Sequence, residues 1–387
     1  MGRARDLALG TLAQWLERKR KPDPKIWIFS SADNTKFNYN SRYLFEYVLS
    51  SLPEVRPVYV VNDDEKRQKL AKEFGPEHVA ETRTLSGMRQ VLAAGVWFTS
   101  AGLPVYARGV GKKRRIINLW HGIPLKRIVL LDPHQSRLSR LYFKKIFSDN
   151  YTWILTTSSR LVPVMAESFG VEEKKIRVWG QPRDDALLKE YRSAAGREGF
   201  HVLYAPTFRD EEATRLFPFP DRDLSVLEAF LQKNDCTIWL RLHPMDTADP
   251  RSCLSEHIRL FGEEQAEDAT ELLHDFDVLV TDYSSIYLDA LLLEIPLIFL
   301  PYDREIYLAR RGFNFPYDEV TPGPKPDTQA AFLQALEESL HGQASFREKR
   351  AAVRDFFHEI KTPCCGRICA EVSGFTAPDS HEKAADR

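Results

Sequence analysis

The feature that most constrains the fold is an alternation of strand-like and helix-like segments, which occurs twice along the chain. The first series of short runs, rich in β-branched and aromatic residues, is "KIWIFS", "RPVYVV", "GVWFTS", "RRIINLW" and "YTWILTTS". The second is "HVLYAPTF", "CTIWLRLHP", "HIRLFG", "DVLVTDYSS" and "PLIFLPYD". Helical patterns such as "SRYLFEYVLSSL" lie between these runs. Such alternation predicts a parallel sheet covered by helices on both faces. We therefore predict an α/β chain with two consecutive doubly wound domains.

Length and composition set the expected domain boundaries. A chain of 387 residues is too long for one ordinary domain. The polar segment "WGQPRDDALLKEYRSAAGREG" separates the two series of strands. We expect one domain over residues 25–180, a second over residues 181–345, and a closing helix with a disordered tail over residues 346–387. In such folds ligands bind beyond the carboxyl ends of the strands, so the cleft between two facing domains is the expected site.

The N-terminal segment, residues 1–24, has the pattern of a basic amphipathic helix. Leu9, Leu12 and Leu16 share one face, and Trp15 lies beside them. Helices of this kind can lie on anionic membranes. An ordinary packed N-terminal helix has the same pattern, so both interpretations stay open. No stretch of the sequence approaches the ~18 continuous apolar residues that span a bilayer.

Charge and cysteine content exclude several classes of function. Lys and Arg number 54 against 55 Asp and Glu, a net charge of −1, which argues against a general nucleic-acid binder. The five cysteines are odd in number, and "CCGRIC" has no second CxxC partner, so we expect a reduced, cytosolic setting rather than a disulfide framework. No HxxxH or HxH pair offers the spacing of a metal site.

Polar residues follow the strands of the second series, where ligands are expected. The turn after "VLVT" contains Ser284 and Ser285 and leads into a helical pattern. Such a turn offers free backbone N–H groups to an anion, although a serine there can simply cap the helix. Cations at neighbouring strand ends favour a phosphate or diphosphate pocket. The residues at these strand ends are Thr207, Arg209, Arg241, His243, Thr281 and Asp282.

His121, in "NLWHGIPLKRI", ends a strand of the first series. Gly122 and Pro124 follow it and suit a fixed turn with close approach of a ligand. Histidine titrates near neutral pH, so His121 is a candidate general base for an attacking hydroxyl. A satisfied structural histidine is the alternative. Lys126 and Arg127 can be solvated surface charge.

Several of these motifs together resemble one family. "NLWHGIPLK", "GQPRDDAL", "VLYAPTFRD", "LRLHP", "VTDYSSIYLDALLLEIPLIFLPYDREIY" and "RGFNF" occur in the order seen in the CDP-glycerol glycerophosphotransferases. These are polyol-phosphate polymerases and primases of wall teichoic acid and related polymers. The resemblance implies a GT-B-like fold, with two Rossmann-like domains facing a central cleft. It also implies that the N-terminal domain takes the acceptor and that the C-terminal domain binds the CDP-polyol.

The resemblance also implies roles for individual residues. His121 and His243 match active-site histidines of the family, and Asp289 matches an acidic residue that can instead be structural. The chain departs from the family at Cys365-Gly366-Arg367, where an Asp-Gly pair before a basic residue is common. The implied substrate-binding residues are Gly122, Lys126, Pro206, Thr207, Arg209, Arg241, Thr281, Asp282, Ser284, Ser285 and Asp289.

The expected activity is transfer of glycerol phosphate, or a related polyol phosphate, from CDP-glycerol or CDP-ribitol to a hydroxyl of a lipid-linked or glycan acceptor. CMP is released, and His121 is the general base. We expect no required cofactor; Asp282 and Asp289 leave a weak opening for Mg²⁺. The enzyme is expected in the cytoplasm, peripheral on the inner face of the membrane. The alternatives are a GT-B glycosyltransferase that uses a nucleotide sugar and a catalytically inactive nucleotide-binding relative.

Overall fold

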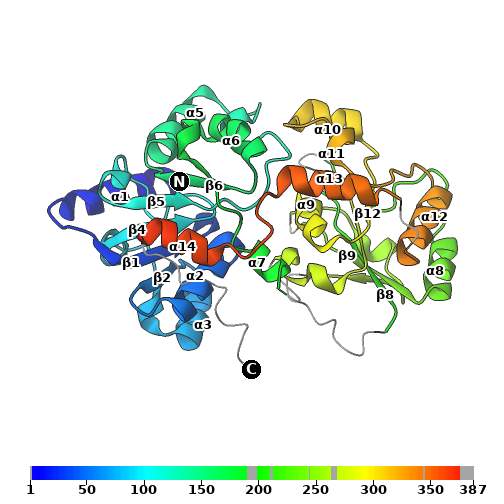
Figure 1. The fold of residues 1–387 in the computed structure, drawn as a ribbon, viewed down its shortest axis with the longest axis horizontal. Helices are drawn as coiled ribbons and strands as arrows, with labels where there is room; N and C mark the ends of the chain where they lie inside the picture. The colour runs from blue at the N-terminus through cyan, green and yellow to red at the C-terminus, as the bar shows by residue number, and fades with distance from the viewer. Residues whose placement is uncertain are drawn as a thin grey trace, which may run out of the picture. The chain divides into compact units, whose positions relative to one another are not determined.

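The computed structural model describes residues 2–189, 198–209, 212–243, 245–262, 268–342 and 345–374. The chain divides into two compact units (Figure 1). Unit 1 consists of Met1–His121, Gln135–Ala186 and Glu359–Arg387, and unit 2 consists of Gly122–His134 and Leu187–His358. Each unit contains a parallel sheet with helices, which confirms the predicted α/β class with two Rossmann-like domains.

Unit 1 is built on a seven-stranded parallel sheet in the order β3-β2-β1-β4-β5-β6-β7. Its strands are β1 (Asp23–Ser30), β2 (Arg56–Val60), β3 (Val79–Ala80), β4 (Ala94–Thr99), β5 (Arg115–Asn118), β6 (Trp153–Thr156) and β7 (Ile176–Val178). Its helices are α1 (Gly2–Leu16), α2 (Tyr39–Ser51), α3 (Asp64–Phe74), α4 (Leu85–Leu92), α5 (Arg137–Phe143), α6 (Val162–Phe169) and α14 (Cys365–Ser373), while α7 (Asp184–Leu187) ends at the unit boundary.

Unit 2 is built on a five-stranded parallel sheet in the order β10-β9-β8-β11-β12. Its strands are β8 (Phe200–Tyr204), β9 (Cys236–Leu240), β10 (Ile258–Leu260), β11 (Val278–Thr281) and β12 (Leu297–Phe299). Its helices are α8 (Leu224–Lys233), α9 (Ile286–Ala290), α10 (Arg304–Arg311), α11 (Tyr317–Val320), α12 (Gln329–Leu340) and α13 (Arg347–Phe357).

The core of unit 1 explains why its strands read as continuous apolar runs. Phe29 of β1 stacks on Phe98 of β4 at 5.1 Å between ring centroids, and Phe45 of α2 meets Phe29 edge-on at 5.6 Å. The C-terminal helix α14 packs into the same core through Cys365 and Cys369. Strands buried on both faces need apolar side chains on both, which gives runs rather than alternation.

The two units do not contain the same segments as the two domains expected from the sequence. The segment Gly122–His134 belongs to unit 2 because Asn314 holds it there. The Asn314 Nδ2 atom donates to the carbonyl oxygens of Pro124, at 2.8 Å, and Lys126, at 2.9 Å. At the other end, residues from Glu359 onward return to unit 1 with α14, whose red ribbon lies among the blue and cyan elements of that unit (Figure 1). The tail expected to be disordered, residues 376–387, lies outside the described residues.

Helix α1 lies against α4 and keeps part of its apolar face in solvent. Gly10 and Ala13 are buried, whereas Leu12, Trp15 and Leu16 are 46%, 57% and 41% exposed. The Arg18 guanidinium lies over the Trp15 ring at 4.2 Å. Within the described ranges, no helix has both the length and the apolar character needed to cross a bilayer.

Candidate active site

The carboxyl ends of four adjacent strands of unit 2 carry the residues that the sequence singled out. His243 follows β9, Thr207 and Arg209 follow β8, and Asp282 follows β11. Asp303, which the sequence analysis did not single out, follows β12. Since these strands are neighbours in a parallel sheet, their loops meet at one edge, as the rule for ligand sites in such folds requires.

Arg209 lies at the centre of this edge and pairs with two carboxylates. Its Nη1 lies 2.6 Å from Asp282 Oδ2, while Nε and Nη2 donate to the two oxygens of Asp303 at 3.0 and 2.9 Å. Burial alone would lower the pKa of the guanidinium, but the charges of Asp282 and Asp303 outweigh it and raise that pKa. Arg209 is therefore a permanent cation, and with its two carboxylates it forms a cluster of net charge −1.

Asp282 also fixes the two loops between which it lies. Its Oδ1 accepts hydrogen bonds from the backbone N–H of Thr207, at 2.8 Å, and of Tyr283, at 2.5 Å. Its backbone carbonyl accepts from the hydroxyl of Tyr317 at 2.8 Å. Both oxygens of the buried Asp282 carboxylate thus accept hydrogen bonds within the protein, and Asp282 links the loops after β8 and β11.

A cavity of about 360 Å³ opens beside the Arg209–Asp303 pair. His134, Arg310 and Arg311 bring further cationic or protonatable groups to its wall, and Asp132 and Glu212 bring carboxylates. None of these five residues was predicted from the sequence. The basic pair directly before "GFNF" was the available signal for Arg310 and Arg311; His134 lies 13 residues after His121 without a motif of its own.

Lys126 lies in the same region of unit 2. Its Nζ donates to the hydroxyl of Tyr307 at 3.3 Å, and Tyr307 stacks on Tyr283 with centroids 4.1 Å apart. The Tyr283 hydroxyl donates to Asp303 Oδ1 at 2.9 Å. Lys126 is therefore part of the polar and aromatic cluster around Arg209 rather than plain surface charge.

His243 and Arg241 are held in different ways. His243 is exposed, its ring stacks on Phe208 at 5.2 Å, and its Nδ1 accepts from the backbone N–H of Met245 at 3.2 Å. This bond leaves Nε2 as the ring nitrogen that can carry the proton and reach a ligand. Arg241 donates instead to the carbonyl oxygens of Phe261 and Gly262 after β10.

The turn between β11 and α9 offers weaker stabilisation of an anion than the sequence pattern predicts. Helix α9 has only five residues, so its dipole is small. Ser284 Oγ accepts from the backbone N–H of Ile286 at 3.4 Å, and Ser285 makes no side-chain cap bond. Three other residues that were predicted to bind the substrate lie in the interior of unit 2. Pro206 is buried, and Asp289 is 2% exposed. Thr281 Oγ1 donates a hydrogen bond to the carbonyl oxygen of Ala205 at 2.7 Å.

In unit 1, the ring of His121 is fixed in one orientation and one tautomer. Its Nδ1 lies 2.9 Å from the carbonyl oxygen of Ser100. Because a carbonyl oxygen can only accept, Nδ1 must carry the proton, and Nε2 is the basic nitrogen. The ring stacks on Tyr39 at 5.1 Å between centroids and contacts the tilted ring of Trp120 at 4.0 Å. This is the arrangement expected of a positioned general base. Gly122, the next residue, is the first of unit 2.

The turn that carries His121 is held by side chains from two distant segments. Asn40 Nδ2 donates to the carbonyl oxygens of Leu119, at 3.2 Å, and Trp120, at 3.0 Å. Arg183 Nη1 donates to the carbonyl oxygen of His121 at 2.9 Å, and the Arg183 backbone N–H donates to Asn40 Oδ1 at 3.1 Å. Trp120 has a φ of 54°, an unfavourable left-handed conformation for a tryptophan. The carbonyls of three consecutive residues are thus fixed around a strained turn.

Sequence comparison finds a matching family model and similar proteins. The family model described as CDP-glycerol:poly(glycerophosphate) glycerophosphotransferase matches residues 12–362. The teichoic acid glycerol-phosphate transferase of Staphylococcus aureus (strain NCTC 8325 / PS 47) is 27% identical over 91% of this chain and 93% of its own length. The teichoic acid poly(glycerol phosphate) polymerase of Bacillus subtilis (strain 168) is 25% identical over 81% of this chain and 44% of its own length.

Comparison with solved structures finds a protein of similar fold. The solved structure of the wall teichoic acid polymerase TagF superposes with a TM-score of 0.76 at 21% identity, covering 96% of this chain and 93% of that one. Several of the polymerases are much longer, and the chain spans about 43–46% of the length of three of the curated relatives that it matches. The match of the family model over most of the sequence shows that the chain belongs to the CDP-glycerol:poly(glycerophosphate) glycerophosphotransferase family.

Proposed function

We propose that this chain transfers a polyol phosphate from a CDP-polyol, CDP-glycerol or CDP-ribitol, to a hydroxyl group of an acceptor and releases CMP. Family membership supports the reaction type. The observation that carries the proposal is the fixed tautomer of His121, whose protonated Nδ1 is bound to the Ser100 carbonyl and whose basic nitrogen is Nε2. A protein that only binds nucleotides has no need of a histidine fixed in this way.

In the proposed step, His121 Nε2 takes the proton of the acceptor hydroxyl as its oxygen attacks the β-phosphorus of the donor. A new bond forms between the acceptor oxygen and this phosphorus. The bond from the phosphorus to the bridging oxygen breaks, and CMP leaves with the electron pair. Catalysis of phosphoryl transfer is mainly positioning and stabilisation of charge on the phosphate oxygens.

The donor is proposed to bind at the carboxyl edge of the unit 2 sheet. Arg209 alone does not offer a net positive charge there, because Asp282 and Asp303 pair with it. The cations that would balance a diphosphate are therefore its neighbours: Arg310 and Arg311 at the cavity beside Arg209, and Lys126 above Tyr307. His243, exposed at the end of β9, would donate to the leaving CMP through Nε2.

We further propose that the acceptor is lipid-linked or a glycan and that the enzyme binds peripherally to the cytoplasmic face of the membrane. The exposed side chains of Leu12, Trp15 and Leu16 on α1 support this location. They are followed by the basic residues Arg18, Lys19, Arg20 and Lys21, which would be attracted to anionic lipids. We propose that the transfer requires no cofactor.

Product analysis tests the proposed reaction. The purified chain is incubated with a lipid-tailed glycan acceptor and CDP-glycerol, CDP-ribitol or a UDP-sugar, and the released nucleotide is identified by chromatography. Release of CMP that depends on acceptor and on a CDP-polyol is the expected result. Release of UDP from the UDP-sugar, with no CMP from either CDP-polyol, would establish the glycosyltransferase alternative instead.

A further inference from the structure

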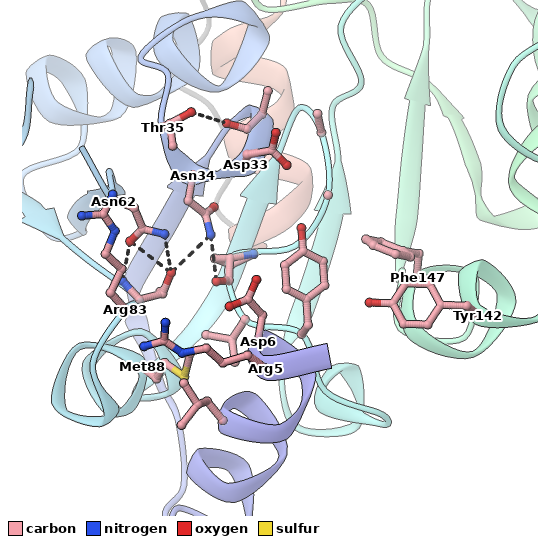
Figure 2. A pocket seen from close by; sticks show the side chains of 18 of the residues that line it. Arg5, Asp6, Asp33, Asn34, Thr35, Asn62, Arg83, Met88, Tyr142 and Phe147 are labelled. Carbon is pink, nitrogen blue, oxygen red and sulfur yellow. Dashed lines mark hydrogen bonds between the residues drawn. The ribbon is translucent and has the colours of Figure 1, made fainter. Parts of the chain in front are cut away.

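Unit 1 contains a cavity of about 700 Å³ at the carboxyl ends of β1, β2, β3 and β4 (Figure 2). Its walls come from the loops after β1, β2, β3 and β4, and from α1 and α5. A cavity at this edge of a doubly wound sheet has the place and size of a ligand site. None of the residues assigned above to donor binding or to proton transfer lines it.

One side of the cavity is a rigid cluster of neutral hydrogen-bonding groups. Asn34 Nδ2 donates to the carbonyl of Pro104 at 3.0 Å and to Thr82 Oγ1 at 3.3 Å. Asn62 Nδ2 donates to the same hydroxyl at 3.1 Å, and Asn62 Oδ1 accepts from the Thr82 backbone N–H at 2.7 Å. Asp33 and Asn34 have φ values of 51° and 54°, so the loop is held in a strained conformation. Strain of this kind concentrates at functional sites.

Several polar groups at the cavity form no side-chain hydrogen bond or ion pair with another described residue. Gln135 Oε1 is buried and accepts no hydrogen bond from any described residue. Buried acceptors in native proteins are nearly always satisfied, so this oxygen is available to accept a hydrogen bond from a ligand in the cavity. Arg5, Asp6 and Asp33 also line the cavity, and none of them forms an ion pair with another described residue. Among the described residues, no ion pair has to break before these groups bind a ligand.

The opposite side of the cavity is aromatic. Figure 2 shows Tyr142 and Phe147 across the cavity from Asn62 and Arg83. Phe147 is in stacked contact with Phe143 at 4.9 Å and meets Tyr106 edge-on at 5.7 Å. The four rings make a continuous apolar wall. An aromatic wall facing amides and hydroxyls is complementary to a sugar, which has an apolar C–H face and a rim of hydroxyl groups.

The numbers of positive and negative side chains at the cavity show that it does not suit the CDP-polyol donor. Two arginines, Arg5 and Arg83, are matched by two carboxylates, Asp6 and Asp33. A site for a nucleoside diphosphate needs an excess of cations, which this balance does not give. The cavity therefore suits a neutral hydroxylated ligand, and its volume of about 700 Å³ accommodates more than one sugar ring.

The cavity is connected to His121 through two short segments. The Ser100 carbonyl accepts from His121 Nδ1, and the next residues, Ala101 and Gly102, line the cavity. The loop that begins with cavity residues 32–35 continues to Tyr39, whose ring stacks on His121. A ligand in the cavity would thus have hydroxyl groups beside the loops that hold the basic imidazole.

Helix α1 connects the same cavity to the proposed membrane surface. Arg5, Asp6 and Leu9 line the cavity, whereas Leu12, Trp15 and Leu16 of the same helix are exposed. We propose that this cavity binds the glycan head of the acceptor, while the lipid part of the acceptor stays at the membrane beside α1. This inference rests on the proposed function.

Saturation-transfer NMR on the full chain tests the glycan site, with the disaccharides cellobiose and N,N′-diacetylchitobiose and with glycerol 3-phosphate as probes. Ser139→Trp places a large ring in the cavity, and Leu138→Trp places the same ring on the exposed face of the same helix. We expect a disaccharide signal in the wild type and in Leu138→Trp, and its loss in Ser139→Trp. Tyr142→Ala, which removes part of the aromatic wall, should weaken disaccharide binding about fivefold.

Three results would overturn the glycan assignment: no disaccharide signal in the wild type, an unchanged signal in Ser139→Trp, or a signal for glycerol 3-phosphate alone. The thermal shift caused by CDP-glycerol is measured on the same samples and reports correct folding and the donor site. It should be equal in all variants. Absence of that shift in the wild type counts against the proposed function, whereas the disaccharide signals report on the cavity independently.

Discussion

Arg183 Nη1 donates a hydrogen bond of 2.9 Å to the backbone carbonyl oxygen of His121. The two residues are 62 positions apart, and the bond fixes the backbone of the residue whose ring carries the proposed base. Together with Asn40, which binds the two preceding carbonyls, Arg183 holds a turn in which Trp120 has a left-handed conformation. We therefore expect Arg183 and Asn40 to be positioning residues, which act on the proposed reaction through His121.

Replacing Arg183 with Met should release this turn and lower kcat about tenfold or more, since small errors in the placement of a catalytic group are costly. The KM for CDP-glycerol should stay unchanged, because the proposed donor site lies in unit 2 and Arg183 lies in unit 1. Arg183→Lys, which keeps a donor, should recover part of kcat. Steady-state kinetics of CMP release measures all three quantities. A rise in the KM for CDP-glycerol with unchanged kcat would contradict the assignment.

Substitution of Arg209 should lower the stability of the protein, whereas substitution of Arg310 should weaken donor binding. Arg209→Ala leaves Asp282 and Asp303 without their cation, and loss of one partner of a buried ion pair costs about 3–5 kcal/mol of unfolding free energy. Urea unfolding followed by circular dichroism measures this loss.

Arg310→Ala removes a cation from the wall of the unit 2 cavity without breaking that buried cluster. We expect it to weaken CDP-glycerol binding about tenfold or more, as loss of a charge-assisted hydrogen bond does. Isothermal titration gives the affinity, and Lys233→Ala on the exposed side of unit 2 is the matched control. Unchanged affinity in Arg310→Ala would place the diphosphate elsewhere.

Helix α1 should contribute to membrane binding through its exposed apolar residues. Replacing Leu12, Trp15 and Leu16 together by Ser removes this surface and should reduce sedimentation with vesicles that contain anionic phosphatidylglycerol by at least about tenfold. Val226→Ser changes an equally exposed apolar residue of α8 and serves as the control. Equal sedimentation of the triple variant and the wild type would exclude α1 as the membrane contact.

Metal dependence is tested by removing divalent ions. The transfer should continue at an unchanged rate after dialysis against EDTA, because the proposed chemistry relies on His121 and on the cations of unit 2. Loss of CMP release that is restored by Mg²⁺ would show that the proposed mechanism lacks a component.

The two sheets could be predicted because their signal is local. Each long strand appears as a run of apolar residues, and the alternation with helical patterns defines a doubly wound fold. Strands β3 and β7 were missed because Val79–Ala80 and Ile176–Val178 are too short to form a recognisable run. The assignment of residues 122–134 to unit 2 depends on Asn314, about 190 residues away, and no local pattern encodes such a contact.

In the candidate site too, the positions of residues at strand ends could be predicted, whereas contacts between distant segments could not. The strand-end rule predicted that Thr207, Arg209, His243 and Asp282 come together, since sheet topology alone determines this. It did not predict that Arg209 pairs with both Asp282 and Asp303, because side-chain pairing depends on loop conformation. The bonds from Asn40 and Arg183 to the His121 turn span 62 to 80 residues and became visible only in the structure.

The most direct test of the proposed reaction is the rate of CMP release by the His121→Asn variant. An asparagine amide can still donate to the Ser100 carbonyl, as His121 Nδ1 does, but it has no basic nitrogen in place of Nε2. With CDP-glycerol and a lipid-tailed glycan acceptor, we expect kcat to fall by roughly 10²–10⁴-fold. The affinity for CDP-glycerol should stay at the wild-type value. A variant that turns over at a near-normal rate would contradict the role of His121 as the general base.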